Sequence, residues 1–253
     1  QLTVENPPEG FYRQYLGGSA MGLYYILKGM PAGADPLGPG NVLTLMLGPT
    51  TGAPISGQSR ATLSAKSPLV DGIGDSQMGG FFPAELKFAG FDGLVITGQA
   101  PRPVYLWLNE GQAELRDAAH LWGKPTAEVE ALLKQELGDD KLEIAQVGPA
   151  GEKRAPLAAV INMANRAAGR TGMGAVMGSK RLKAIVARGK SKRLSLADAR
   201  RYLAEGHFHK GSMGPKIEAC ISFLERGGQS AVISNPENLG RALKGETGTW
   251  LVP

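Results

Sequence analysis

"SQMGGFFPAELKFAGFDGLVITG", residues 76–98, decides how the middle of the chain folds. Gly79 and Gly80 place two positions without side chains in a row, which allows another group to approach the backbone closely. Residues 91–98 are rich in β-forming side chains and end at a glycine, so they predict a strand. Between them, Glu85 and Lys87 stand at the i, i+2 spacing of a strand. The stretch therefore predicts sheet structure next to unusually open backbone.

The composition fits a globular protein with a moderate excess of positive charge. The 253 residues are 42% apolar, and 28 basic against 23 acidic side chains give a net charge of +5. This excess is spread along the chain rather than gathered in runs, so we expect anionic ligands and no nucleic-acid partner.

Cysteine and hydropathy patterns exclude several classes of protein. The single cysteine, Cys220, cannot form an internal disulfide framework or an all-cysteine zinc or iron–sulfur site from this chain alone. No stretch approaches the roughly 18 apolar residues of a membrane-spanning helix, and the N-terminus lacks the layout of a signal peptide. We expect a cytoplasmic protein without a membrane partner, and the missing initiator Met suggests a processed or truncated start.

The first half of the chain predicts two sheets with few helices. Apolar residues at helical spacing predict a helix over 20–28. Strands are expected within 41–52 and 60–69, where β-forming residues precede Gly-Pro or alternate with polar ones. Residues 91–118 read as a meander of three strands joined by a proline-bounded turn and a hairpin.

The next segment mixes a surface helix with further strands. Residues 126–138 predict a helix that begins with a capping signal from Thr126 to Glu130 and ends at a glycine. Two strands around a Gly-Pro turn are expected within 141–163. A glycine-dense stretch, a basic turn and a strand are expected within 165–189.

A change in the sequence pattern near residues 188–195 predicts a domain boundary. The tail, 190–253, contains a capped helix, a second helix with a Gly-Gly stop, a strand and a third helix, over 195–206, 214–228, 230–234 and 235–245. We therefore predict an α+β fold: two largely antiparallel β-sheets with flanking helices over residues 1–189, and a small C-terminal α/β tail.

Three glycine-rich loops are the candidate binding elements. They are GGSAMG (17–22), SQMGG (76–80) and NRAAGRTGMG (165–174). Backbone N–H groups in such loops can contact an anion, and Arg60, Arg166 and Arg170 can add bidentate phosphate contacts. For any one loop, tight turns and close packing are an equally good explanation, and none of the three has the spacing of a P-loop or Rossmann motif.

Residues 4–188 resemble the N-terminal domain of the tungsten-containing aldehyde ferredoxin oxidoreductase family. Five motifs in order carry the resemblance: YLGGSAMGLYYIL, LGPTTGAPISGQSRATLSAKSPL, the stretch 76–98 quoted above, IAQVGPAGE and NRAAGRTGMGAVMGSKRLKAI. The resemblance implies a two-sheet base for two pyranopterins that hold tungsten and are bridged by magnesium. It assigns residues 1–189 to this tungsten-bispyranopterin-binding domain.

The resemblance also implies which residues form the site. Gly79 and Gly80 would lie against a pterin, with Arg60, Arg166 and Arg170 near pterin or phosphate. The backbone carbonyls of Gln77 and Ala167 would bind the bridging magnesium. These assignments come from the family alone, and the list of implied cofactor residues is Arg60, Gln77, Gly79, Gly80, Arg166, Ala167, Gly169 and Arg170.

Two positions depart from the family pattern. Ser19 stands in the first glycine loop where the family usually carries an Arg, and Gln77 stands where it carries an Asn. A serine cannot supply a guanidinium fork, whereas Gln77 still offers its main-chain carbonyl. Relatives also hold a [4Fe–4S] cluster with cysteines that this chain lacks. The resemblance implies oxidation of aldehydes with ferredoxin as acceptor, a possible second chain with the missing domains, and a homo-oligomer; catalytic residues are not identified.

Residues 195–253 resemble the C-terminal segment of carbamate kinase, which has an amino-acid-kinase fold. The family places a lysine like Lys216 near ATP phosphates, although a solvated helix residue is the simpler interpretation here. Two other functions therefore stay open beside the oxidoreductase portion. The chain could be a cofactor-free structural or composite module, or a nucleotide-binding protein of amino-acid-kinase type.

The remaining polar candidates have simpler structural explanations. His207 and His209 lack a third ligand at metal-binding spacing, so exposed loop histidines are favoured. A turn position is expected for His120 and a core position for Cys220. Turn and cap roles are expected for the aspartates that precede or follow glycines, namely Asp71, Asp75 and Asp92.

Overall fold

The computed structural model describes residues 1–53, 57–189, 193–208, 211–234, 236–243 and 248–253. The chain divides into two compact units, residues 1–189 and 190–253. Each unit has its own apolar core. Within the described segments, no helix has the length and apolarity needed to cross a bilayer.

The first sheet of unit 1 is antiparallel throughout. It contains β1 (Leu43–Leu47), β2 (Ala61–Lys66), β3 (Ile73–Met78) and β4 (Gly93–Ile96) in the order β3-β2-β1-β4. Successive residues on each strand face opposite sides of the sheet, so Leu63 lies in the core between the sheets while Thr62 faces the other side. Because β3 is the first strand in this order, it is an edge strand.

The second sheet has six strands in the order β6-β5-β10-β7-β8-β9. Only β5 and β10 pair in parallel, so the prediction of two largely antiparallel sheets is confirmed. β9 lies at one edge. The strands are β5 (Val104–Asn109), β6 (Gln112–Asp117), β7 (Glu143–Gln146), β8 (Val160–Asn162), β9 (Arg166–Ala168) and β10 (Leu182–Arg188).

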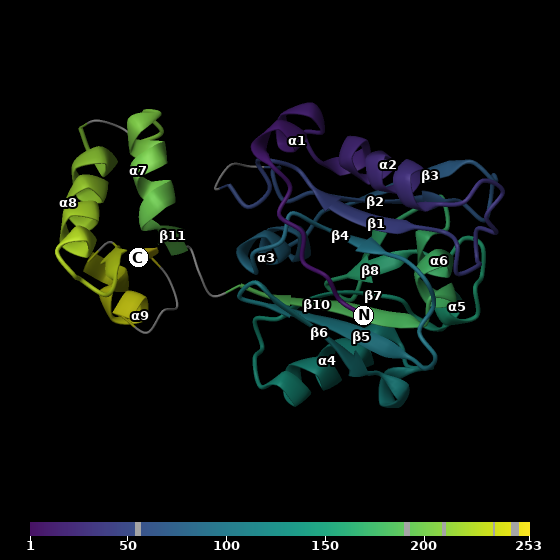
Figure 1. The fold of residues 1–253 in the computed structure, drawn as a ribbon. Helices are drawn as coiled ribbons and strands as arrows, with labels where there is room; N and C mark the ends of the chain where they lie inside the picture. Colours follow the sequence, from purple (N-terminus) through teal and green to yellow (C-terminus); the bar gives the residue numbers. More distant parts are fainter. Residues whose placement is uncertain (54–56, 190–192, 209–210, 235, 244–247) are drawn as a thin grey trace. The chain divides into compact units, whose positions relative to one another are not determined.

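Helices separate and cover the two sheets (Figure 1). The main core lies between the sheets and includes α3 (Phe82–Phe88) and α6 (Met173–Ser179). The outer face of the first sheet is covered by α2 (Gly18–Gly29), with α1 (Glu9–Gln14) before it. The outer face of the second sheet packs on α4 (Thr126–Leu137) in a smaller core. The prediction of flanking helices is confirmed.

Local chemistry explains where several predictions were wrong. Glu85 and Lys87 lie on α3 rather than on a strand, because Pro83 starts a helix whose Phe82 and Leu86 are buried one turn apart. The Gly-Pro turn is α5 (Pro149–Glu152), again a helix opened by proline. The glycine-dense stretch also contains a helix, α6, whose seven residues are all buried.

The cap predicted for α4 was wrong although the helix was right. Pro125 occupies the N-cap position and makes no side-chain cap bond, while Gly138 ends the helix in the left-handed conformation. The hydroxyl of Thr126 instead donates to the carbonyl of Ala164 at 3.0 Å. Thr126 therefore supports the hairpin between β8 and β9 rather than its own helix.

Unit 2 is a three-stranded sheet with helices. β11 (Arg193–Ser195), β13 (Thr249–Val252) and β12 (Ala231–Ile233) pair in that order, and the sequence predicted only β12. The predicted cap of α7 (Leu196–Ala204) is present, since Ser195 Oγ accepts from the backbone N–H of Asp198 at 3.0 Å. α8 (Met213–Glu225), η2 (Pro236–Asn238) and α9 (Leu239–Leu243) complete the unit. Residues 235, 244 and 245 of the third predicted helix fall outside the described part of the chain.

Candidate functional site

The end of β3 brings Arg60 against Gly79. Ala61 pairs with Met78, so the residues next to them, Arg60 and Gly79, face each other where the two strands separate. The guanidinium Nη1 of Arg60 lies 3.5 Å from the point that a Cβ on Gly79 would occupy. The exposed guanidinium group of Arg60 thus lies directly beside the backbone of Gly79, which has no side chain.

Gly80 has a backbone conformation that other residues rarely adopt. Its φ is +92°, and an added Cβ would overlap the amide oxygen of Asn162 and lie 2.9 Å from the sulfur of Met163. The hydroxyl of Ser59 donates to its carbonyl oxygen. Close approach from β8 therefore requires glycine at position 80.

The hairpin from β8 to β9 places Arg166 next to this point. Asn162 pairs with Arg166 in register, and the amide Nδ2 of Asn162 donates to the Arg166 carbonyl at 3.4 Å. Met163 and Ala164 in the turn both have left-handed backbones, with φ of 49° and 57°. Such strain is tolerated where the surroundings hold it, here including the bond from Thr126.

The third glycine loop packs against the inner face of β3. Ser76 Oγ donates to the carbonyl of Arg170 at 3.1 Å and lies 2.6 Å from the hydroxyl of Thr171. Ser67 Oγ donates to the Thr171 carbonyl at 2.8 Å. Arg170, Thr171 and Gly172 have φ of 63°, 52° and 77°. Buried serines thus hold three consecutive left-handed residues beside the edge strand.

The first glycine loop lies on the other face of the same sheet. Gly18 begins α2 next to the hydroxyl of Thr62, whose register partner is Gln77. One position further, Ser19 Oγ donates to the exposed carboxylate of Asp75. The position where the family usually has an arginine is therefore bonded to an acidic side chain.

All eight predicted cofactor residues lie along the meeting of β3 and β9, which are neighbours in the fold. We call this set the glycine–arginine rim: Arg60, Gln77, Gly79, Gly80, Arg166, Ala167, Gly169 and Arg170. All are at least partly exposed. Within the described residues, none of its three arginines takes part in an ion pair. The rim is therefore a surface of open backbone with uncompensated positive charge.

Three polar residues that support the rim, two of them buried, were not predicted from the sequence. Asn162, Ser76 and Thr126 each bond to a backbone carbonyl of the β9 hairpin or of the loop after it. The only signal was a polar residue within an apolar strand pattern, as in the run Val160–Asn162. Such a residue shows that a polar partner is needed but not which one.

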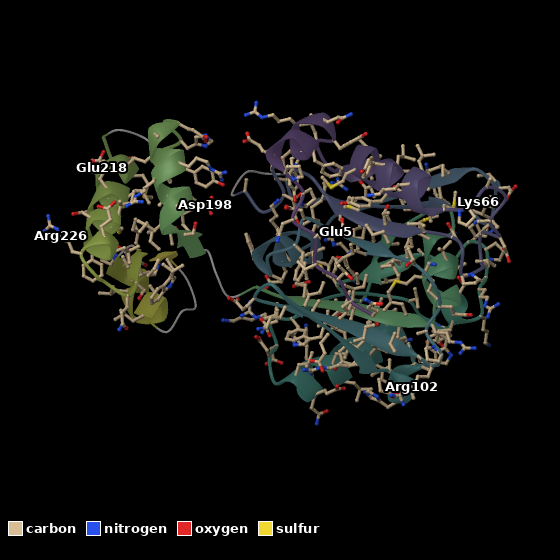
Figure 2. All side chains as sticks on the ribbon, viewed as in Figure 1. Glu5, Lys66, Arg102, Asp198, Glu218 and Arg226 are labelled. Carbon is tan, nitrogen blue, oxygen red and sulfur yellow. The ribbon has the colours of Figure 1, made fainter. Side chains whose placement is uncertain are left out.

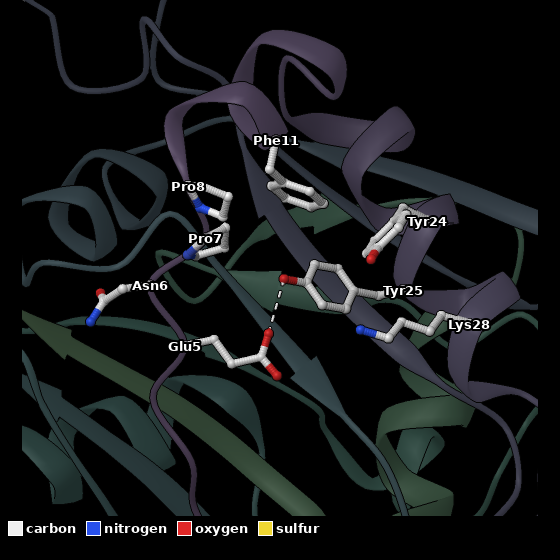
Figure 3. Close-up of a pocket in the computed structure, with 8 residues that line it drawn as sticks. All are labelled: Glu5, Asn6, Pro7, Pro8, Phe11, Tyr24, Tyr25 and Lys28. Atoms are coloured by element: carbon white, nitrogen blue, oxygen red, sulfur yellow. Dashed lines mark hydrogen bonds between the residues drawn. The ribbon is translucent and has the colours of Figure 1, made fainter.

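A separate hollow of about 320 Å³ lies between the N-terminal segment and α2 (Figure 3). Tyr25 donates its hydroxyl to Glu5 at 3.2 Å, and burial together with the charge of Glu5 raises the pKa of Tyr25 to about 12. None of the rim residues lines this hollow. Its lining residues are Glu5, Asn6, Pro7, Pro8, Phe11, Tyr24, Tyr25 and Lys28.

The weaker histidine, cysteine and lysine candidates keep their structural explanations. His207 pairs with Glu205 at 3.0 Å, and His209 falls outside the described residues. His120 lies in a 3₁₀ turn beside Glu136. Cys220 packs against the tail's core, where burial raises its thiol pKa, and Lys216 is exposed on α8. Across the described segments, no cluster of three or more His, Cys, Asp or Glu side chains could hold a metal ion.

The aspartates make local contacts. Asp71 has a left-handed backbone in the turn after β2 and pairs with Lys66 at 2.8 Å. Asp92 pairs with Lys87 across the loop after α3. These two fit the predicted turn roles, whereas Asp75 is bonded to Ser19 beside the rim.

A sequence profile of the aldehyde ferredoxin oxidoreductase N-terminal domain matches residues 1–189. The chain belongs to this family. This family member is 46% identical over 203 residues to the tungsten-containing aldehyde ferredoxin oxidoreductase of Thermococcus kodakarensis, covering 80% of this chain and 33% of that protein. The chain thus spans about a third of the length of the curated relatives that it matches.

A solved structure and a second kind of relative complete the comparison. The active site complex BamBC of benzoyl coenzyme A reductase, solved with 1,5-dienoyl-CoA, aligns with a TM-score of 0.70 and 37% identity over 72% of this family member and 28% of that chain. A short segment matches carbamate kinases. It is 52% identical over 60 residues to a carbamate kinase-like protein of Escherichia coli, covering 24% of this chain and 19% of that protein.

Proposed function

We propose that residues 1–189 bind a tungsten-bispyranopterin cofactor at the glycine–arginine rim. The observation that carries the proposal is the guanidinium of Arg60 against the bare backbone of Gly79, next to a second arginine, Arg166, on the facing edge strand. A flat cofactor with phosphate groups requires close backbone approach and unpaired cations, and the rim offers both. The residues present therefore fit the group.

Each rim residue has a proposed role in binding. Arg60, Arg166 and Arg170 would hold phosphate or pterin oxygens through their guanidinium forks. Gly79, Gly80 and Gly169 would let the rings lie close to the main chain. The carbonyls of Gln77 and Ala167 would bind the bridging magnesium, a hard cation that prefers oxygen ligands.

The bound cofactor would supply two-electron redox chemistry at tungsten, or at molybdenum in its place. We propose that the whole enzyme converts an aldehyde and water to a carboxylic acid, with two electrons passing to ferredoxin and two protons released to water. This chain would contribute the cofactor base. A [4Fe–4S] cluster and the acid–base residues would come from the further domains that the longer relatives have, on the same protein or on a second chain. A cytoplasmic homo-oligomer is the proposed setting.

Cofactor content tests the proposal directly. The chain would be produced with tungstate in a host that makes pyranopterin, and tungsten, magnesium and pterin fluorescence would be measured per chain. We expect stoichiometric cofactor in the unaltered chain and strong loss in the Arg60→Ala/Arg166→Ala double variant with its fold retained. Arg102→Ala is the matched control, because Arg102 is exposed and pairs only with Asp117 among the described ion pairs (Figure 2). Tungsten- and pterin-free wild-type protein would overturn the proposal.

A second candidate function belongs to the tail. The 60-residue match to carbamate kinases favours nucleotide binding there. We rank it second because the match covers about a fifth of that relative. A rise in the melting temperature of unit 2 with ATP and magnesium would support it, and an unchanged melting temperature would reject it.

A further inference from the structure

The side chain of Asn162 lies where the two edge strands of the rim meet. It is 0% exposed. Its amide nitrogen donates to the Arg166 carbonyl at 3.4 Å and approaches the sulfur of Met78 at 3.6 Å. Its amide oxygen lies against Gly80, in the space that a side chain there would fill. One carboxamide therefore contacts β3, the loop after it and β9.

Among the described residues, no group donates a hydrogen bond to the amide oxygen of Asn162, which is fully buried. A buried acceptor without a donor destabilises the folded state, and an apolar side chain of similar size would avoid that loss. The stability of the fold alone does not explain an asparagine at this position. Its placement between the two halves of the rim does.

We infer that Asn162 is a positioning residue for the cofactor, an inference that rests on the proposed function. Through its contacts with Gly80 and the Arg166 carbonyl, Asn162 sets the separation between the Gly79 side and the Arg166 side of the rim. It acts through these neighbours and does not touch the cofactor. Supporting residues of this kind tune the affinity of bound metal centres without being ligands.

Asn162→Leu separates this role from a structural one. The variant removes the unsatisfied acceptor, so the melting temperature of the cofactor-free chain should stay equal or rise. Tungsten and pterin retained after gel filtration should nevertheless fall by about tenfold. If the role of Asn162 were purely structural, Asn162→Leu would have a lower melting temperature and an unchanged cofactor content in its folded fraction.

Asn109→Leu is the matched control, because Asn109 also has a buried amide oxygen without a partner among the described residues but lies at the end of β5. It should leave cofactor content unchanged. If Asn162→Leu does not fold, Asn162→Ala decides by the same measurement, since a smaller side chain cannot overpack. Wild-type cofactor content in the folded Asn162 variant overturns this inference alone. A wild-type chain without tungsten and pterin overturns the proposed function and the inference together.

Discussion

The arginines of the rim and the arginine at the end of β10 have opposite surroundings. Arg188 donates to Glu85 at 2.8 Å and to Asp139 at 2.6 Å, so its charge is balanced by two carboxylates. Arg60 and Arg166 lie on open backbone without an ion pair in the described structure. The paired Arg188 links α3, the end of α4 and β10. The unpaired arginines of the rim can instead bind an anion from outside the chain.

A second ion pair of the balanced kind is fully buried. Lys183 is 0% and Glu152 5% exposed in their side chains, and Lys183 also donates to the carbonyl of Lys124 at 3.0 Å. Burial lowers the pKa of Lys183, and the bond to Glu152 raises it again in part. In unit 1 the buried Lys183 is thus paired with a carboxylate, whereas the exposed arginines of the rim have no ion-pair partner among the described residues.

The largest expected effect comes from breaking that buried pair. Glu152→Leu leaves the Lys183 ammonium without its carboxylate and should lower the free energy of unfolding by about 3–5 kcal/mol. Urea denaturation followed by circular dichroism measures it. The Lys183→Met/Glu152→Leu double variant should recover most of the loss, and a double variant as unstable as the single one would contradict this account of the pair.

The next effect tests the backbone of the rim itself. Gly80→Ala forces a side chain onto a φ of +92° and against Asn162, so unfolding free energy should fall by about 3 kcal/mol. Gly79 has no positive φ and its Cβ position is only in ordinary contact with Arg60. Gly79→Ala should therefore cost less than about 1 kcal/mol in stability. Equal losses in the two variants would show that strain does not distinguish these neighbours.

Arginine removal compares the two regions directly. Arg188→Ala should destabilise the chain by about 2 kcal/mol, because Glu85 and Asp139 lose a partly buried partner. Arg60→Ala and Arg166→Ala should change stability by less than about 0.5 kcal/mol, as expected for exposed side chains without ion pairs. Thermal and urea unfolding of the three variants in parallel gives the answer. A rim variant as unstable as Arg188→Ala would mean that the rim arginines support the fold.

The sheets and the rim residues could be predicted from the sequence, but the residues that support the rim could not. Strand alternation and glycine positions are local patterns, so β1, β2 and β5 and the three loops could be predicted from residues in one stretch. Ser76 bonds to the Arg170 carbonyl in the loop after β9, and Asn162 approaches the Met78 sulfur in β3. Both partners are distant in the sequence, and no local pattern identifies them. Glu85 shows the same limit: its strand-like spacing was overruled by Pro83 and by its bond to Arg188.

The smallest expected effect concerns Glu143, a partly buried acidic residue of the second sheet. Glu143 on β7 is partly buried, and its pKa is raised to about 7, chiefly by burial; the charge of Lys134 opposes this rise, and the charges of Glu130 and Glu85 add to it. Because the folded pKa exceeds the unfolded value of 4.5, the protonated carboxyl contributes stability below about pH 4.5 that is lost as the pH rises through 7. Glu143→Gln should thus gain about 1–2 kcal/mol at pH 8 and nothing at pH 4.

The pH dependence of that gain is the informative measurement. Melting temperatures of Glu143→Gln and wild type should diverge as the pH rises from about 4.5 to 7, where the unfolded chain ionises this carboxyl while the folded protein keeps it protonated. Glu218→Gln, at an exposed position of α8 (Figure 2), is the control for the same substitution at the surface. A constant gain at every pH would mean that Gln packs better than Glu. A gain confined to high pH would instead show that burial disfavours the charge of Glu143 on β7.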